Sequence, residues 1–195
     1  MSELIKIPMF PLSIFPLPGE LVPLHIFEPR YKQLLNDAES RDISFGIYFN
    51  HIANEEKLGS LVKLESVLKR YPSGESDIIV KCTDLFSMAM LYRTFRDKLY
   101  PGGEVSLWNV ETSHPLSPLL LQEYTEYRTL LKINNQHNSL GFYDVANELN
   151  LSFEERLRFV KLDAEKKETF LLTRLRYQTR LLHEVEKSKD LFHLN

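Results

Sequence analysis

Prolines recur through an apolar segment near the N-terminus, and they limit what this part of the chain can form. Residues 7–27 are rich in isoleucine, leucine and phenylalanine, but five prolines stand between Pro8 and Pro23. Proline lacks the backbone N–H that a sheet ladder needs and breaks a helix, so we expect edge strand and extended coil rather than a central strand. A turn is expected at Pro18 and Gly19. The same prolines interrupt the apolar run that a signal peptide requires.

The remainder of the first 110 residues has the pattern of a small β-rich structure with one helix. The helix should begin at Glu28 and Pro29, because proline suits the first helical turn. Its apolar residues then follow at helical spacing, namely Tyr31, Leu34, Leu35 and Ala38. Strands are expected at 45–50, 59–71 and 78–86, with a possible extension over 88–95 and a last strand over 105–110. The turn at 71–76 makes an antiparallel hairpin of the second and third strands.

From residue 117 the apolar period becomes helical. Ser117 and Pro118 are typical of an N-cap and first turn, and Ser152 with Glu155 has the spacing of a capping box. A last helix carries an apolar stripe of Leu171, Leu175, Gln178, Leu182 and Val185. We therefore expect two domains, a β-barrel subdomain at 1–115 and an α-helical bundle subdomain at 116–195. The stripe fits packing inside the bundle or against another copy, so the oligomeric state stays open.

Composition and charge exclude several classes of partner. A formal net charge of −3 and a pI near 6.1 provide no positive field to attract phosphates or an anionic membrane. No stretch reaches the roughly 20 apolar residues that cross a bilayer. The single cysteine, Cys82, lies in an alternating apolar segment and is expected to be a buried thiol in a reducing compartment, which favours the cytoplasm. Nucleic acid and membrane are therefore not expected as partners.

One string of residues is specific enough to point to a family. It comprises Phe10, Pro11, Leu12, Phe15, Pro16, Pro18, Gly19 and the run from Leu24 to Tyr31. This segment closely resembles the opening of the Lon protease N-terminal substrate-binding domain, in its free-standing bacterial form. The resemblance implies an α+β fold: a twisted antiparallel PUA-like β-barrel with one short inserted helix, followed by a C-terminal α-helical bundle. It also implies a role in recognising exposed segments of other proteins.

The catalytic parts of Lon-like proteases are missing from this sequence. No glycine-rich phosphate-binding loop with its lysine occurs, and about 80 residues after the barrel are too few for an ATPase and a peptidase. Six scattered histidines without a helical His pair, and one cysteine, predict no metal site, and we expect no cofactor. The carboxylate neighbours Glu55 and Glu56, like Glu154 and Glu155, are expected to be solvated surface charge. No nucleophile and base can be paired, so the chain is not predicted to be an enzyme.

Two sets of residues are candidates for a site. The apolar residues Phe10, Phe15, Leu17 and Leu21 are predicted to line a groove beside a strand edge, where an extended peptide adds by backbone pairing. The alternative is that they are barrel core, which is favoured slightly for Phe10 and Phe15. The family-motif residues are expected to be structural: His25, Phe27, Glu28, Pro29, Arg30 and Tyr31. In that interpretation Glu28 interacts with the helix dipole, Arg30 holds a carboxylate or loop carbonyls, and His25 bonds to the backbone.

The sequence thus predicts a non-catalytic polypeptide-binding module, an adaptor or regulator in protein quality control. Its expected partners are unfolded or partner polypeptides, with a protease or chaperone as a further candidate. The alternative is an RNA-binding protein that uses the PUA-like barrel, against which the acidic charge stands. A local cluster of Arg174, Arg176 and Arg180 has no acid between Glu168 and Glu184, and is interpreted as a solvated helix face rather than a site for an acidic partner.

Overall fold

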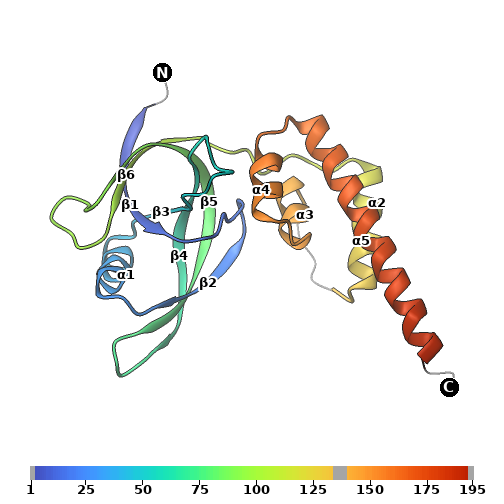
Figure 1. Ribbon diagram of the computed structural model, residues 1–195, viewed down its shortest axis with the longest axis horizontal. Coiled ribbons are helices and arrows are strands. Elements are labelled where there is room, and N and C mark those ends of the chain that lie inside the picture. The colour runs from blue at the N-terminus through green and yellow to red at the C-terminus, as the bar shows by residue number, and fades with distance from the viewer. Residues whose placement is uncertain (1–2, 134–139, 193–195) are drawn as a thin grey trace. The chain divides into compact units, whose positions relative to one another are not determined.

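A computed structural model describes residues 3–133 and 140–192 of the chain. Contacts divide the chain into two units, one of Met1–Glu111 with Ser152–Leu157 and one of Thr112–Leu151 with Arg158–Asn195. The strands, all in the first unit, are β1 (Leu4–Pro11), β2 (Leu21–Ile26), β3 (Phe45–Tyr48), β4 (Leu58–Arg70), β5 (Ser76–Tyr92) and β6 (Gly102–Leu107). The helices are α1 (Pro29–Arg41), α2 (Pro118–Leu130), α3 (Phe142–Glu148), α4 (Phe153–Val160) and α5 (Ala164–Phe192) (Figure 1). The predicted α+β class is confirmed, while the predicted boundary near residue 115 stays a prediction.

The six strands form one sheet in the order β2-β5-β4-β3-β1-β6, and an additional pairing of β5 with β6 closes it on itself. The long strand β5 makes this closure possible. One of its edges pairs with β4 along most of its length, while the other pairs with β2 over Ser76 to Lys81 and with β6 over Phe86 to Tyr92. Strand β2 therefore lies outside the closed circuit, at the edge of the sheet, as the proline pattern predicts for this segment.

Strand β1 differs from the prediction. It pairs with β3 in parallel and with β6 in antiparallel orientation, so it is a central strand and the sheet is not wholly antiparallel. The prolines are tolerated because they stand where the ladders end: Pro8 is the last residue paired with β6, and Pro11 the last paired with β3. Between them the Met9 N–H donates to the Pro101 carbonyl at 2.8 Å. The parallel pairing needs a long crossover, which β2 and α1 provide.

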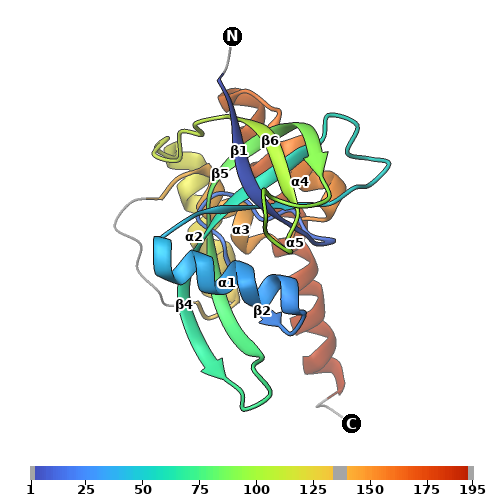
Figure 2. The same cartoon turned by 90° about the vertical axis from the view of Figure 1, so that its left-hand side faces the viewer.

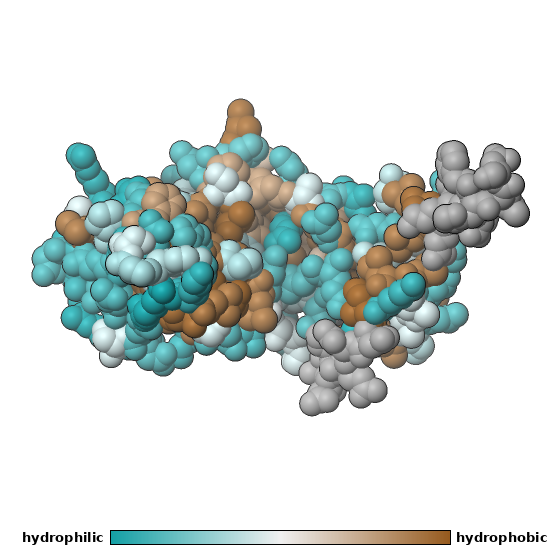
Figure 3. Space-filling view, turned by 90° about the horizontal axis from the view of Figure 1, so that it is seen from below, coloured by the Kyte–Doolittle hydropathy of each residue, from teal (hydrophilic) through white to brown (hydrophobic). Residues whose placement is uncertain are grey.

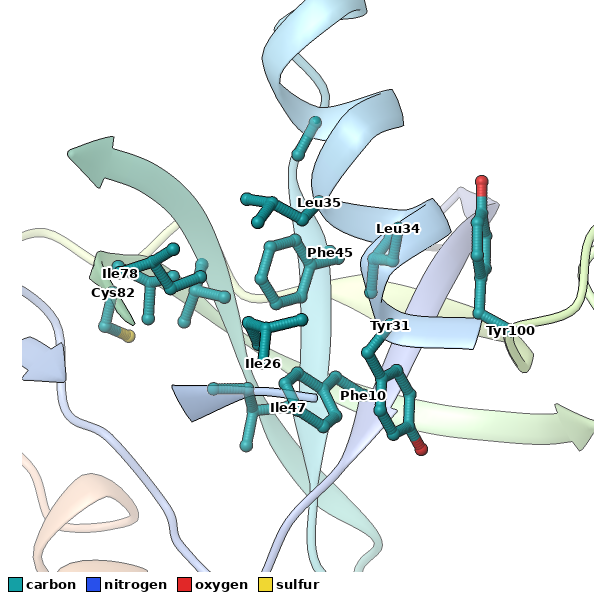
Figure 4. Close-up of a cluster of buried hydrophobic side chains, with 13 residues drawn as sticks. Phe10, Ile26, Tyr31, Leu34, Leu35, Phe45, Ile47, Ile78, Cys82 and Tyr100 are labelled. Carbon is teal, nitrogen blue, oxygen red and sulfur yellow. The ribbon is translucent and has the colours of Figure 1, made fainter. Parts of the chain in front are cut away.

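Helix α1 closes one side of the strand core. Pro29 occupies its first turn, and the predicted apolar residues of its inner face, Tyr31, Leu34, Leu35 and Ala38, are all buried. Figure 4 shows Leu34, Leu35 and Tyr31 directed toward Phe45, Ile47 and Phe10 of the strands. Burying one such leucine stabilises the fold by about 1.5–3 kcal/mol. Figure 2 shows that the paired ends of β4 and β5 reach beyond this helix.

A second apolar cluster lies elsewhere in the sheet, around the fully buried Phe86. Two glycines of neighbouring strands make room for this ring. A Cβ atom at Gly59 would lie 2.2 Å from Phe86 Cζ and 2.8 Å from the Ile47 carbonyl oxygen, and a Cβ at Gly46 would lie 2.9 Å from the same ring. These positions therefore exclude any larger residue while the ring keeps its place.

The second unit is helical. Its helices start as predicted: the Ser117 hydroxyl accepts from the Leu120 N–H at the start of α2. At the start of α4, which belongs to the first unit, the Ser152 hydroxyl accepts from the Glu155 N–H at 3.2 Å while the Ser152 N–H donates to the Glu155 carboxylate at 2.9 Å, so the capping box is confirmed. Helix α5 buries Leu171 and Leu175 of its predicted stripe, but Val185 is 51% exposed. Helix α3 was not predicted; its first turn is held by Asp144, whose carboxylate accepts the Gly141 N–H at 2.7 Å.

Candidate functional site

The free edge of β2 is the feature of the first unit that is open to a partner strand. Among the described strands, β2 pairs with β5 alone. Its side chains alternate: Val22, Leu24 and Ile26 face the apolar core, whereas Leu21, Pro23 and His25 are exposed. Leu21 is 56% exposed and Phe27, just after the strand, is 57% exposed. Figure 3 shows from below that apolar side chains gather in patches between hydrophilic ones.

The hydrogen-bond phase of β2 determines which backbone groups point to this edge. The Cys82 N–H donates to the Glu20 carbonyl at 2.9 Å, directly before the strand. In an antiparallel pair this hydrogen-bonding pattern repeats every second residue. The backbone N–H and C=O groups of Val22, Leu24 and Ile26 therefore point toward β5. The backbone groups of Leu21 and His25 then point outward, together with the carbonyl of Pro23. The edge can therefore form backbone hydrogen bonds with a partner strand at every outward position except the missing N–H of Pro23.

A cluster of polar and aromatic side chains stands at one end of β2. His25 lies opposite Asp77 in the β2–β5 register, and its Nδ1 is 2.7 Å from Asp77 Oδ1. The Tyr71 hydroxyl donates to the other Asp77 oxygen at 2.6 Å, and Glu75 Oε2 lies 3.7 Å from His25 Nε2. The hydrogen bonds from Tyr71 and His25 lower the pKa of the Asp77 carboxyl, and the same bond to Asp77 raises the pKa of Tyr71. The prediction that His25 bonds to the backbone is therefore wrong. The β2–β5 register instead places the carboxylates of Asp77 and Glu75 beside its ring.

The other family-motif residues lie around the start of α1. Glu28 is the N-cap residue, Pro29 follows it, and the Arg30 guanidinium binds the Glu28 carboxylate at 2.7 and 2.9 Å. Tyr31 is buried, and its ring centroid lies 4.0 Å from that of Phe10. Phe27 instead stacks on His25, with ring centroids 5.9 Å apart. The motif therefore joins the end of β2 to the helix, and Phe27 is its exposed apolar member.

Three of the four residues predicted for polypeptide binding are core residues. Phe10, Phe15 and Leu17 are 6%, 3% and 0% exposed, so they line no surface groove and the alternative interpretation holds for them. Phe10 belongs to a strand that pairs on both edges. Leu17 is fixed in the loop before β2, where its N–H donates to the Glu20 carboxylate at 2.9 Å. Leu21 alone is exposed, and its part in binding stays a prediction.

Sequence reasoning missed Asp77 and Tyr71, which complete the cluster around His25. They lie 52 and 46 residues from it in sequence. Only the pairing register of β2 with β5 brings them together, and no local pattern reports that register. Phe27 lies within the motif, but its exposure could not be predicted from the sequence, because an apolar residue next to a strand is usually buried.

Other candidate groups among the described residues are isolated, buried or paired. No group of three or more His, Cys, Asp or Glu side chains within 3–133 and 140–192 is arranged to hold a metal ion. Cys82 is 1% exposed, and burial raises the pKa of its thiol. In α5, Arg176 pairs with Glu123 of α2 at 2.8 Å and Arg180 with Glu184 at 3.3 Å, so two members of the arginine cluster have acidic partners. None of the described helices combines the length and apolar character needed to span a membrane.

Comparison with known proteins identifies the family to which this chain belongs. Two solved structures share the fold: a Lon N-terminal domain protein from Xanthomonas campestris is 23% identical with a TM-score of 0.66, covering 89% of this chain and 98% of its own. The N-terminal domain of the Mycobacterium avium complex Lon protease is 13% identical with a TM-score of 0.58, covering 88% and 98%. No match to a curated protein was found. The family model of the ATP-dependent protease La (LON) substrate-binding domain matches residues 6–185, and the chain therefore belongs to this family.

Proposed function

We propose that this chain is a non-catalytic module that binds exposed segments of other polypeptides. The observation that carries the proposal is the match of residues 6–185 to the LON substrate-binding domain. The open edge of β2 supports it, because a strand edge gives backbone hydrogen bonds to any extended segment regardless of its sequence. The exposed side chains of Leu21 and Phe27 supply apolar contacts at the two ends of that edge.

The binding mode that we propose is strand addition to β2. The bound segment would place its backbone beside Leu21, Pro23 and His25, and its alternate side chains on the outer face of the sheet. This mode favours unfolded or extended segments over folded proteins, because a folded protein has few unpaired backbone groups to offer. Such selectivity suits an adaptor or regulator in protein quality control.

The binding experiment uses reduced, carboxymethylated α-lactalbumin labelled with fluorescein, with native α-lactalbumin as the folded control. Anisotropy should rise for the unfolded form alone. Leu21→Ser and Phe27→Ser should each weaken binding about 5-fold, as expected for the loss of one apolar contact. Leu99→Ser is the matched control, because Leu99 is exposed to a similar degree, 61%, in another loop. Equal binding of both forms of α-lactalbumin would refute the function, whereas equal effects of the three variants would refute the site.

The adaptor or regulator role has its own test. A purified full-length ATP-dependent Lon protease is assayed for hydrolysis of labelled casein with increasing amounts of this chain. An adaptor should raise the rate, and a module that holds substrate away from the protease should lower it. An unchanged rate at saturating concentrations would exclude the regulatory role while leaving polypeptide binding intact.

A further inference from the structure

The loop between β3 and β4, residues 49–57, is built rigidly yet presents an isoleucine to solvent. The Asn54 side chain, 5% exposed, donates to the carbonyls of Phe49 and Leu58 and accepts the Leu58 N–H, at 3.1, 2.8 and 2.8 Å. These bonds fix the two ends of the loop together. Ile52, by contrast, is 88% exposed, the largest value of any exposed large hydrophobic residue described. Figure 2 shows the loop (teal, right) projecting from the strands.

Three partly exposed rings lie together at this loop, two from the loop itself and one from α4. The ring of Phe153, at the start of α4 and within the same unit, lies 5.0 Å from the ring of Phe49 and 5.2 Å from that of His51. The rings of Phe49 and His51 are 5.1 Å apart. The Ala53 N–H donates to His51 Nδ1 at 3.2 Å, which holds the imidazole against the loop backbone. We call Phe49, His51, Ile52 and Phe153 the aromatic patch.

Exposed acidic residues lie next to members of the aromatic patch in the sequence. Glu55 and Glu56 follow Ile52 in the same loop, Glu154 follows Phe153, and all three are exposed. The cations nearest in sequence are Lys57 and Arg158, which are exposed, and Arg156, whose guanidinium binds Glu20 at 2.5 and 3.1 Å. Negative charge therefore dominates around the patch. A rim of this sign disfavours RNA and anionic lipid, and it favours a partner that carries cations.

We propose that the aromatic patch is a second binding surface, and that its partner is a polypeptide segment that carries arginine next to an apolar residue. A guanidinium can stack on the faces of the rings while its charge pairs with the carboxylates of Glu55 and Glu154. The apolar neighbour then contacts Ile52. An apolar centre with a charged rim is the usual anatomy of a protein interface. This surface is separate from the edge of β2, so it does not depend on the function proposed for that edge.

The probe is a fluorescein-labelled dodecapeptide in which arginine and leucine alternate between terminal glycines, measured by anisotropy at low and high salt. We expect binding that weakens at high salt. Glu55→Lys should weaken it at least 10-fold and Ile52→Ser about 5-fold. The matched controls are Glu65→Lys, an exposed acid on β4, and Leu99→Ser, which should bind as the unmodified chain does. Because the β2 edge also accepts extended segments, the same losses should appear when Glu55→Lys or Ile52→Ser is added to Leu21→Ser, which separates this surface from the β2 edge.

Further probes test the chemistry of the partner. A dodecapeptide with glutamate in place of arginine should bind at least 10-fold more weakly, and one with serine in place of leucine should also bind more weakly. Equal binding of the arginine and glutamate peptides would overturn the proposal, as would unchanged affinity in both Glu55→Lys and Ile52→Ser. Binding of oligouridylate or phosphatidylglycerol vesicles that is lost in Ile52→Ser would overturn it in favour of RNA or membrane. The fluorescence of Trp108 in urea checks that each variant unfolds at the midpoint of the unmodified chain.

Discussion

Asp37 is a buried carboxylate on α1 that holds the loop after β5 to the strand core, and its removal should destabilise the first unit. It is 8% exposed and accepts a hydrogen bond at 2.7 Å from the hydroxyl of Tyr100, which is 1% exposed. Lys98 Nζ lies 2.9 Å from the same carboxylate. In Asp37→Ala the Tyr100 hydroxyl would be left buried without its partner, and Lys98 would lose its counter-ion.

The magnitude follows from these contacts. A buried hydroxyl without a partner costs about 1–3 kcal/mol, and a hydrogen bond to a charged group contributes about 1.5–3 kcal/mol. Because the Lys98 side chain retains some contact with water, we expect Asp37→Ala to lower the free energy of unfolding by about 3 kcal/mol. Tyr100→Phe removes only the hydroxyl and should cost about 1–1.5 kcal/mol. The double variant should cost less than the sum, because the unpaired hydroxyl is then absent.

Urea unfolding measures these differences. Trp108 is the single tryptophan of the chain, and its Nε1–H donates to the Ser87 hydroxyl at 2.9 Å within the first unit, so its fluorescence reports on that unit. The control is Asp42→Asn, which removes an exposed ion pair with Lys63 at a left-handed position that asparagine tolerates, and it should cost less than about 1 kcal/mol. A cost for Asp37→Ala no larger than that of Asp42→Asn, or additive effects of the Asp37 and Tyr100 variants, would refute the reasoning.

The same carboxylate predicts a pH dependence. Burial alone would raise the pKa of Asp37, but the hydrogen bonds from Tyr100 and Lys98 outweigh it and lower the pKa below the ordinary 3.8. A group whose pKa is lowered by folding stabilises the fold above its unfolded pKa, and this contribution disappears as the pH falls through the folded value. The stability difference between the unmodified chain and Asp37→Asn should therefore be constant above about pH 5 and shrink below about pH 4.

Three further outcomes are expected. Gly59→Ala should lower the free energy of unfolding by about 3 kcal/mol or more in the Trp108 assay, since its Cβ would overlap the Phe86 ring; a cost below about 1 kcal/mol would show that the ring can move. Cys82 should react with a thiol reagent at least about 100-fold more slowly in the native chain than in denaturant, because it is buried and its thiol pKa is raised. Ser152→Ala should cost about 1 kcal/mol by removing the cap of α4, measured by circular dichroism in urea, and Ser152→Asp should restore most of it.

Local signals in the sequence predicted much of the fold. The start of α1 at Pro29, the hairpin of β4 and β5, and the capping box at Ser152 each depend on residues a few positions apart, and the structure confirms all three. The burial of Cys82 follows in the same way from the alternation around it. Such features are predictable because the interactions that produce them lie within one turn of helix or one pair of strands.

Features that depend on distant pairing were not predicted. The prolines of β1 predict an edge strand, but proline excludes a central position only where a ladder hydrogen bond is needed, and Pro8 lies at the end of a pairing. The contact of His25 with Asp77 depends on the β2–β5 register. Phe49 and Phe153 adjoin across about 100 residues of sequence, which no periodicity within either segment reports.

The position of Pro23 bears on how an open edge can serve binding without promoting aggregation. An unpaired strand edge is a template for other copies of the same strand, and natural proteins commonly block it with proline or charge. Pro23 lies in the middle of β2, opposite Ile79, so the outer ladder lacks one N–H donor there. Two copies of β2 paired edge to edge would lack two donors, one from each chain, whereas an extended segment of another protein would meet only one gap. At about 1 kcal/mol for each missing hydrogen bond, this difference favours a foreign segment over self-pairing by roughly 5-fold. The same proline that reduces the strength of the edge therefore gives it a preference for the partners that we propose.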